Sequence, residues 1–192
     1  KRLIYGYSAV NDQKKKQFKN TIRKINMNDI ISIDETSIDN RCIQNYGWNK
    51  SGKEVIMKKY VNKRIRYTLI CGMSTKGIEH YKLVNGSAKA ADFNKFIQEL
   101  YYKKSNRYLL MDNASIHHNK GLLNIVSTNK LVYNAPYCPE YNPIEMLFSK
   151  LKRQLCRQYP TTLINQVKKI LESITKNETT NYFNHTKCLW IK

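Results

Sequence analysis

The sequence predicts an α/β fold in which a mixed five-stranded sheet is flanked by helices. Two observations lead to this prediction. Three strand-like segments follow one another and end in turns, which implies that they pair antiparallel. Two further apolar runs then alternate with segments of helical periodicity, as in sheets whose strands are connected through helices. The predicted order is β-β-β-α-β-α-β-α-α, and the sequence contains no internal repeat.

The first half of the chain supplies the three antiparallel strands. Residues 29–33 (DIISI) form a β-branched run that ends at Asp34 and fits a buried strand. The second strand is expected at 64–73 and the third, which alternates in polarity, at 77–84. Residues 45–53 are rich in turn-forming side chains and predict a hairpin tip between the first two strands.

The second half switches to helical periodicity. Apolar residues recur at helical spacing over 88–104, which predicts a helix. The short run 107–111 ends at Asp112 and predicts a fourth strand. A helix is expected over 117–127, followed by a fifth strand over 131–134.

A proline-rich loop precedes the last predicted helices. The loop covers 135–143, and Pro143 suits the first turn of a helix that runs to about residue 157. Thr161 or Thr162 is positioned to cap a further helix. The apolar face of that helix is predicted to be Val167, Ile170, Leu171 and Ile174.

The chain length and charge limit its possible partners. The 192 residues suit one domain, which we place at 29–192, with the basic segment 1–28 as a helix or linker leading into it. Lys plus Arg number 34 against 14 Asp plus Glu, so the net charge is +20. A polyanion that neutralises this charge is the expected partner, and nucleic acid is the first candidate. The alternative is a solvated basic surface without a partner.

Several other classes fit the sequence poorly. No stretch approaches the roughly 20 apolar residues that span a bilayer, and the start of the chain lacks the features of a signal peptide. The five cysteines are scattered, and no pair has C-x-x-C spacing. This argues against a zinc site and a disulfide framework. We therefore expect no membrane partner and a location inside the cell, with the DNA.

Three carboxylates stand at points where chemistry is commonly placed. Asp34 and Asp112 each follow an apolar strand, and Glu145 lies in the first helical turn after Pro143. If the two strands are neighbours, the two aspartates lie side by side and repel each other unless a proton or cation intervenes. Mg²⁺ favours such oxygen ligands and leaves room for phosphates. Two metal ions held this way can support an in-line displacement at phosphorus. A single aspartate at a strand end, in contrast, usually serves only as a turn or capping residue.

Four sequence blocks resemble the DDE transposases of the mariner and related insertion-sequence superfamily. The blocks are 33–37 (IDETS), 111–118 (MDNASIHH), 136–145 (PYCPEYNPIE) and 148–152 (FSKLK). The third block is the most specific, and the resemblance covers roughly residues 29 to 175.

This resemblance implies an RNase H-like fold, cut-and-paste transposition, and Mg²⁺ or Mn²⁺, with two ions. It assigns the catalytic and metal-binding triad to Asp34, Asp112 and Glu145. The intervals are 112 − 34 = 78 and 145 − 112 = 33 residues.

Other polar residues compete for a role at this site. Alternation along the strand sends Glu35 to the face opposite Asp34, and Glu140 precedes the helix in a loop. Asn113 and His117 are expected to contact the metal ligands or a phosphate. Equally, these two side chains could only shape the turn.

Six side chains near the site are candidates for contact with DNA. The amino groups on the helix after Glu145 could hold the phosphate backbone, and the aromatic ring of the hairpin tip could stack on distorted DNA ends. The six are Trp48, Lys50, Lys53, Lys150, Lys152 and Arg153. The alternatives are a solvated helix face and a tryptophan packed on the sheet.

The resulting hypothesis is the catalytic core of a DNA transposase that cuts and joins strands, acting as a homodimer that pairs two ends. The alternatives are a catalytically silent, transposase-derived DNA-binding protein and a structure-selective nuclease of the same fold. Family members usually carry helix-turn-helix modules ahead of the core. Only about thirty residues precede Asp34, so we expect the module that recognises transposon ends to be absent from this chain.

Overall fold

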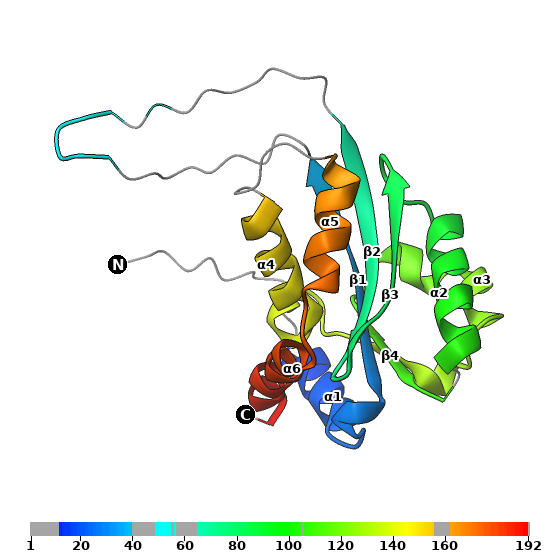
Figure 1. Ribbon diagram of the computed structural model, residues 1–192. Helices are drawn as coiled ribbons and strands as arrows, with labels where there is room; N and C mark the ends of the chain where they lie inside the picture. Colours follow the sequence, from blue (N-terminus) through cyan, green and yellow to red (C-terminus); the bar gives the residue numbers. More distant parts are fainter. Residues whose placement is uncertain are drawn as a thin grey trace.

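Five strands form one mixed sheet in the part of the chain that the computed structural model describes, namely residues 12–39, 49–54, 56, 65–104, 106–155 and 162–191. The strand order is β3-β2-β1-β4-β5 (Figure 1). The strands are β1 (Ile30–Asp39), β2 (Arg66–Ser74), β3 (Gly77–Asn85), β4 (Tyr108–Met111) and β5 (Leu131–Tyr133). β1 and β3 each pair antiparallel with β2, whereas β4 pairs parallel with both β1 and β5. The predicted mixed sheet is confirmed.

Helices cover both faces of the sheet. The helices are α1 (Asp12–Ile22), α2 (Ala90–Lys104), α3 (Lys120–Leu123), α4 (Ile144–Leu155), α5 (Leu163–Glu172) and α6 (Lys176–Ile191). α2 and α3 lie on one face, and α4 and α5 lie on the other, with α1 and α6 at its lower end (Figure 1). Among the helices described, none is both long and apolar enough to cross a membrane.

Alternation along β1 divides the apolar core into two layers. Ile31 and Ile33 are fully buried with the residues of α2, and Ile30 is fully buried in the layer that contains α4. Successive side chains of a strand point to opposite faces. The central strand is therefore covered on both sides, and a polar residue of β1 must find its partners inside the protein.

β1 is longer than the sequence predicts. The expected strand ended at Asp34, whereas the observed strand continues to Asp39, so Asp34 lies within it. Pairing with β2 down to Asp39↔Arg66 satisfies the backbone of this extension. The prediction stopped too early because the apolar run ends at Ile33, although Thr36 is still buried. The parallel ladder with β4 nevertheless ends just before Asp34, at Ser32↔Leu110.

The helix predicted over 117–127 is wrong in extent. Two short helices replace it, the 3₁₀ helix η2 (Ser115–His118) and α3. Asn119 separates them, because its extended backbone and its side chain, which accepts the Leu122 N–H at 3.0 Å, begin a new helix. The apolar periodicity around Leu122 does mark a helix, but this helix, α3, is only one turn long.

α6 was not predicted. Its buried positions are Thr179, Phe183, Thr186 and Trp190. Their spacing is helical, but two of the four are threonines, so the apolar pattern is weak in the sequence.

The basic helix α1 packs against this C-terminal helix. Phe18 and Ile22 belong to the same core layer as α4 and α6, and the Arg23 guanidinium donates to the Trp190 carbonyl at 2.9 Å. The division of the chain at residue 28 stays a prediction.

Two helix starts give a test of local stability. Asn119 caps α3 through its side chain, whereas Thr162, at the N-cap of α5, makes no such bond. Asn119→Ala should lower the free energy of unfolding by about 1–2 kcal/mol, and Thr162→Ala by less than about 0.5 kcal/mol. Urea denaturation of the two variants measures both. Equal losses would show that the capping geometry does not govern these helix starts.

Candidate active site

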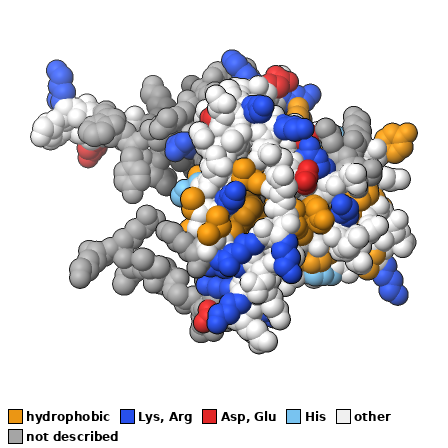
Figure 2. All heavy atoms as spheres, turned by 90° about the horizontal axis from the view of Figure 1, so that it is seen from below, with side chains coloured by type: hydrophobic (Ala, Val, Ile, Leu, Met, Phe, Trp, Pro, Cys, Tyr) orange, Lys and Arg blue, Asp and Glu red, His pale blue; other side chains and the backbone are white. Residues whose placement is uncertain are grey.

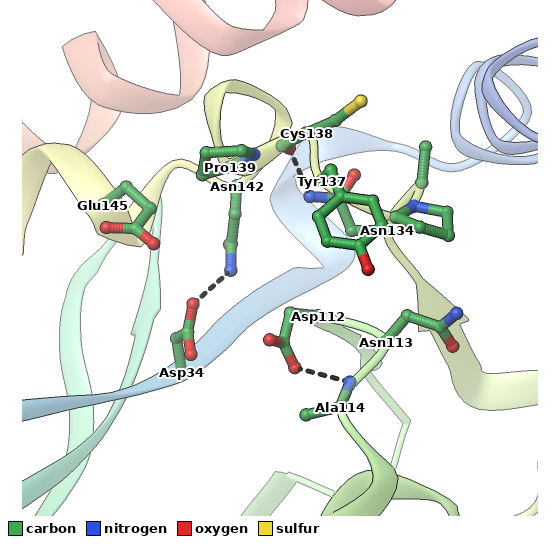
Figure 3. A pocket seen from close by; sticks show the side chains of 12 residues that line it. Asp34, Asp112, Asn113, Ala114, Asn134, Tyr137, Cys138, Pro139, Asn142 and Glu145 are labelled. Carbon is green, nitrogen blue, oxygen red and sulfur yellow. Dashed lines mark hydrogen bonds between the residues drawn. The ribbon is translucent and has the colours of Figure 1, made fainter. Parts of the chain in front are cut away.

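The register between β1 and β4 brings the two predicted aspartates together. Ser32 pairs with Leu110, an offset of 78 residues, and continuing this parallel register sets Asp34 beside Asp112. The loop after β5 then leads into α4, whose first turn carries Glu145. All three carboxylates line one pocket with a volume of about 420 Å³ (Figure 3).

The carboxylates approach this pocket from different sides. In Figure 3, Asp34 lies between Glu145 and Asp112, and its carboxylate is turned toward Asn142. In this conformation, no three His, Cys, Asp or Glu side chains of the described residues converge tightly enough to form a metal-binding group. The three predicted residues therefore line one pocket, while each aspartate is held by its own protein partners, and the triad itself stays a prediction.

Asp34 is a buried carboxyl group, 9% exposed, with two bonds to its oxygens. The Glu35 N–H donates to Oδ1 at 2.7 Å, and Asn142 Nδ2 donates to Oδ2 at 3.2 Å. Burial raises the pKa of Asp34 to about 8, and the charge of Asp112 adds to this effect, as do those of Glu145 and Glu35. The Glu35 N–H opposes the shift only in part. Such an environment favours a proton or a cation at this carboxyl group.

Asp112 is held in the opposite electrostatic state. Its partial burial alone would raise its pKa, but the hydrogen bond from His117 and the Ala114 N–H hold the pKa below its usual value. The two bonds measure 2.7 Å from His117 Nδ1 and 3.0 Å from the Ala114 N–H. Asp112 is therefore fixed as an anion at the edge of the pocket.

Glu145 resembles Asp34 more than Asp112 in this respect. Its pKa is raised, first by burial and also by the charge of Asp112, whereas the nearby charge of Lys152 acts to lower it. The pocket thus contains two carboxyl groups whose charged form is disfavoured, next to one that is firmly ionised.

His117 links the pocket to the opposite face of β1. The ring is completely buried, packs on Phe93 at 4.4 Å between centroids, and contacts Glu35 through Nε2 at 3.2 Å. Burial would lower its pKa, but the hydrogen bonds with Asp112 and then Glu35 raise it to about 10. His117 is therefore an imidazolium that donates from both nitrogens to two carboxylates.

The role of His117 stays a prediction. In this conformation its ring contacts the pocket carboxylate of Asp112 and has no exposed surface. Glu35 does lie on the face opposite Asp34, as alternation requires, yet it acts on the site through His117. The sequence offered no signal for that link, because the two residues are 82 positions apart.

Asn113 lines the pocket and is exposed. Its Oδ1 lies 2.6 Å from His118 Nε2, and the His118 ring stacks on Tyr133 with centroids 4.3 Å apart. Asn113 is thus available to a ligand, whereas His118 braces the turn.

Two further pocket residues were missed by the sequence reasoning. Asn142 is 2% exposed and bonds Asp34. Tyr137 is 60% exposed at the pocket and has a backbone φ of 58°, which is rare for a residue with a side chain. Both stand in the 135–143 loop, whose sequence contributes to the family resemblance but assigned no role to either residue.

The lysines and arginine predicted to contact DNA fall into different settings. Lys150 pairs with Glu178 of α6, whereas Lys152 and Arg153 are exposed on α4. Lys50 and Lys53 are exposed in a turn closed by a 3.0 Å backbone bond. Trp48 lies outside the described residues. Figure 2 views the molecule from the end where α1 and α6 lie, and there Lys and Arg side chains far outnumber acidic ones.

Comparison with solved structures shows the same fold. A structure of the Mos1 mariner paired end complex with Mn gives a TM-score of 0.74 at 17% identity, and covers 100% of this chain and 65% of that chain. The Mos1 transposase paired-end complex with left transposon end gives 0.75 at 18% identity, with the same coverage. The Mos1 transposase catalytic domain with raltegravir and Mn gives 0.70 at 18%, covering 97% of this chain and 95% of that one. The RNase H-like fold is thereby confirmed.

The chain thus spans about two thirds of the longer Mos1 chains and nearly all of the catalytic domain. No curated protein matches it by sequence. A family model described as DDE superfamily endonuclease matches residues 29–167, which is 139 of the 192 residues. The chain belongs to the DDE superfamily endonuclease family.

Proposed function

We propose that this chain is the catalytic core of a DNA transposase, which cuts and joins DNA strands with Asp34, Asp112 and Glu145. One observation carries the proposal. Three carboxylates from separate parts of a DDE-family chain line a single pocket. The net charge of +20 supports a polyanionic substrate.

The donor set of the pocket suits Mg²⁺ or Mn²⁺, and we propose two ions. Asp34, Asp112 and Glu145 offer the oxygen ligands that these hard cations prefer. The raised pKa of Asp34 reflects burial beside other carboxylates, a repulsion that a divalent cation relieves. When bound, such ions supply an activated nucleophile and stabilise the leaving oxygen at the phosphate. Related Mos1 structures were solved with Mn and with Mg.

The protein's own groups prepare this chemistry. Asn142 and the Glu35 N–H fix both oxygens of Asp34, and His117 holds Asp112 ionised. The nucleophile is water in cleavage and a DNA 3′ hydroxyl in joining, so no side chain needs to form a covalent bond with DNA. Lys152 and Arg153, exposed on the helix that carries Glu145, are proposed to hold the phosphate backbone. Asn113 is proposed to contact the substrate at the pocket edge, and Trp48, Lys50 and Lys53 to contact DNA ends.

The proposed partners are transposon ends, target DNA and a second copy of the chain. Two of the similar Mos1 structures are described as paired-end complexes, one of them with left transposon end, which supports a homodimer acting on two ends. We also propose that the protein works inside the cell, where its DNA lies.

The decisive experiment combines the full-length protein with duplex DNA that carries the inverted repeats flanking the coding sequence, in Mg²⁺ or Mn²⁺. We expect metal-dependent nicking and strand transfer that Asp112→Ala abolishes. Cleavage by Asp112→Ala equal to that of the parent would refute the mechanism. Metal-independent binding without cleavage would identify a silent DNA-binding protein. Preferential cutting of junctions or RNA–DNA hybrids would identify a structure-selective nuclease.

Lys152 provides a test of the proposed DNA contact. Lys152→Gln should weaken DNA binding and reduce the slope of log K against log[salt] by about 0.9, the value for one phosphate contact. Lys120→Gln, an exposed lysine on α3 and on the other face of the sheet, is the matched control and should leave the slope unchanged. Fluorescence anisotropy at several salt concentrations measures both. Identical slopes for the two variants would remove Lys152 from the DNA contact.

A further inference from the structure

A chain of three hydrogen bonds joins β1 to the start of α4 inside the protein. The Ile144 N–H donates to Ser32 Oγ at 3.2 Å, Ser32 Oγ donates to Asn142 Oδ1, and Asn142 Nδ2 donates to Asp34 Oδ2 at 3.2 Å. Ser32 is completely buried and Asn142 nearly so. Buried polar groups of this kind are costly unless they are paired, and here each one has a partner.

The bonding capacity of each group fixes the direction of this chain. A serine hydroxyl has one hydrogen to donate. Because a backbone N–H already points at Ser32 Oγ, that hydrogen is directed at the amide oxygen of Asn142. The amide NH₂ must then face Asp34. When Asp34 is ionised, as a metal ligand must be, the reverse orientation would set the amide oxygen against a carboxylate oxygen, which is an acceptor facing an acceptor.

Asn142 also bonds the backbone of Glu145, the residue that carries the third carboxylate. Its carbonyl accepts the Glu145 N–H at 3.2 Å, which is part of the first turn of α4. Pro143 favours an extended backbone at the residue before it, and Asn142 has φ −105° and ψ 109°. A single residue therefore bonds the side chain of Asp34 with its amide (Figure 3) and the backbone of Glu145 with its carbonyl.

We infer that Asn142 is the positioning residue that sets the spacing between the carboxylates of Asp34 and Glu145, with Ser32 orienting its amide. The inference rests on the proposed function, because it assigns a role toward the metal ions proposed for this pocket. Asn142 is not itself a ligand, since its amide oxygen is occupied by Ser32. Partners that orient metal ligands typically contribute 10- to 100-fold to metal affinity or activity.

The test compares Asn142→Ala and Ser32→Ala with the wild-type chain. Asn142→Ala should weaken Mn²⁺ binding, measured by calorimetry without DNA, by at least about tenfold. It should lower kcat for Mn²⁺-dependent plasmid nicking by a similar factor and leave KM for DNA unchanged. A residue that only supported folding would lower the melting temperature without this split. Asn94→Ala is the matched control, because this substitution removes a comparable amide hydrogen bond on the other side of the sheet. In the wild-type chain Asn94 Nδ2 donates to Asn119 Oδ1 at 2.8 Å.

Ser32→Ala carries the inference if Asn142→Ala does not fold. It should change Mn²⁺ affinity in the same direction by a smaller factor. The double variant should bind Mn²⁺ no more weakly than Asn142→Ala alone, because both act through one contact. Amide exchange measured by NMR gives a second test that needs no metal. The side-chain amide NMR signal of Asn142 should exchange slowly in the wild-type chain and faster in Ser32→Ala.

The possible outcomes distinguish failure of the proposed function from failure of the role inferred for Asn142. If the wild-type chain neither binds Mn²⁺ nor nicks DNA, the proposed function fails and this inference falls with it. If the wild-type chain does both and Asn142→Ala equals it in Mn²⁺ affinity and kcat, only the inference is overturned. A rapidly exchanging Asn142 amide in the wild-type chain also overturns it.

Discussion

Glu145→Gln is expected to lower the rate of metal-dependent DNA nicking by more than about 100-fold, because loss of a ligand should exceed the 10- to 100-fold cost of losing a residue that merely supports one. The substitution preserves the shape of the side chain and removes its charge. Burial and the neighbouring Asp112 raise the pKa of Glu145, so its charged form is unfavourable in the fold. A neutral glutamine should therefore leave the melting temperature equal or slightly higher.

Glu140→Gln is the matched control for this prediction. Glu140 precedes the same helix and is exposed in the 3₁₀ helix η4 (Pro139–Tyr141), outside the residues that line the pocket. It should nick plasmid DNA at the wild-type rate. Equal and undiminished nicking by the two glutamine variants would exclude Glu145 from the triad. Loss of nicking in both variants would show that the carboxylate of Glu140 is needed as well.

His117→Ala is expected to lower the free energy of unfolding by about 3 kcal/mol, which is in the range for removing one partner of a buried ion pair. The substitution leaves a void against Phe93 and sets the carboxylates of Glu35 and Asp112 near each other without a cation between them. His118→Ala is the control, since His118 is exposed and only stacks on Tyr133. Urea denaturation measures both variants. Losses of equal size would contradict the bridging role of His117.

The same residue predicts a pH dependence of stability. The folded-state pKa of His117 is raised from 6.5 to about 10, so its stabilising contribution is complete below pH 6.5 and is lost as the pH rises through 10. The difference in melting temperature between wild type and His117→Ala should therefore shrink between pH 6 and pH 10.5. A difference that stayed constant over this range would show that the imidazolium does not stabilise the fold.

The fold was largely predictable because its strands are marked by strong local patterns. Residues 77–84 alternate, the predicted strand 107–111 contains the apolar run 108–111, and both segments became strands close to the expected bounds. α6 escaped prediction because buried threonines interrupt its apolar face. The predicted first strand ended too early, at Asp34. The second half of β1 is stabilised by pairing with β2, and not by a local apolar run.

The pocket was predictable in its composition but not in its internal bonding. Asp34, Asp112 and Glu145 carry recognisable local sequence, so they could be named in advance. The Asn142 and His117 contacts depend on which side chains meet across the sheet. Asn142 and Asp34 are 108 positions apart, and no local pattern encodes such a meeting. The hydrogen bonds of Asn142 and His117 could therefore be identified only from the structure.

The ladder between β1 and β4 also governs when the pocket can be completed during synthesis of the chain. It pairs residues 78 positions apart, and the pocket is completed only by α4, a further 33 positions on from Asp112. A chain emerging from the ribosome forms its first hairpins early, because they are local, and closes distant pairings late. A partly translated copy therefore contains Asp34 on a strand with no opposing carboxylates. The pocket is therefore complete only after translation has passed Glu145.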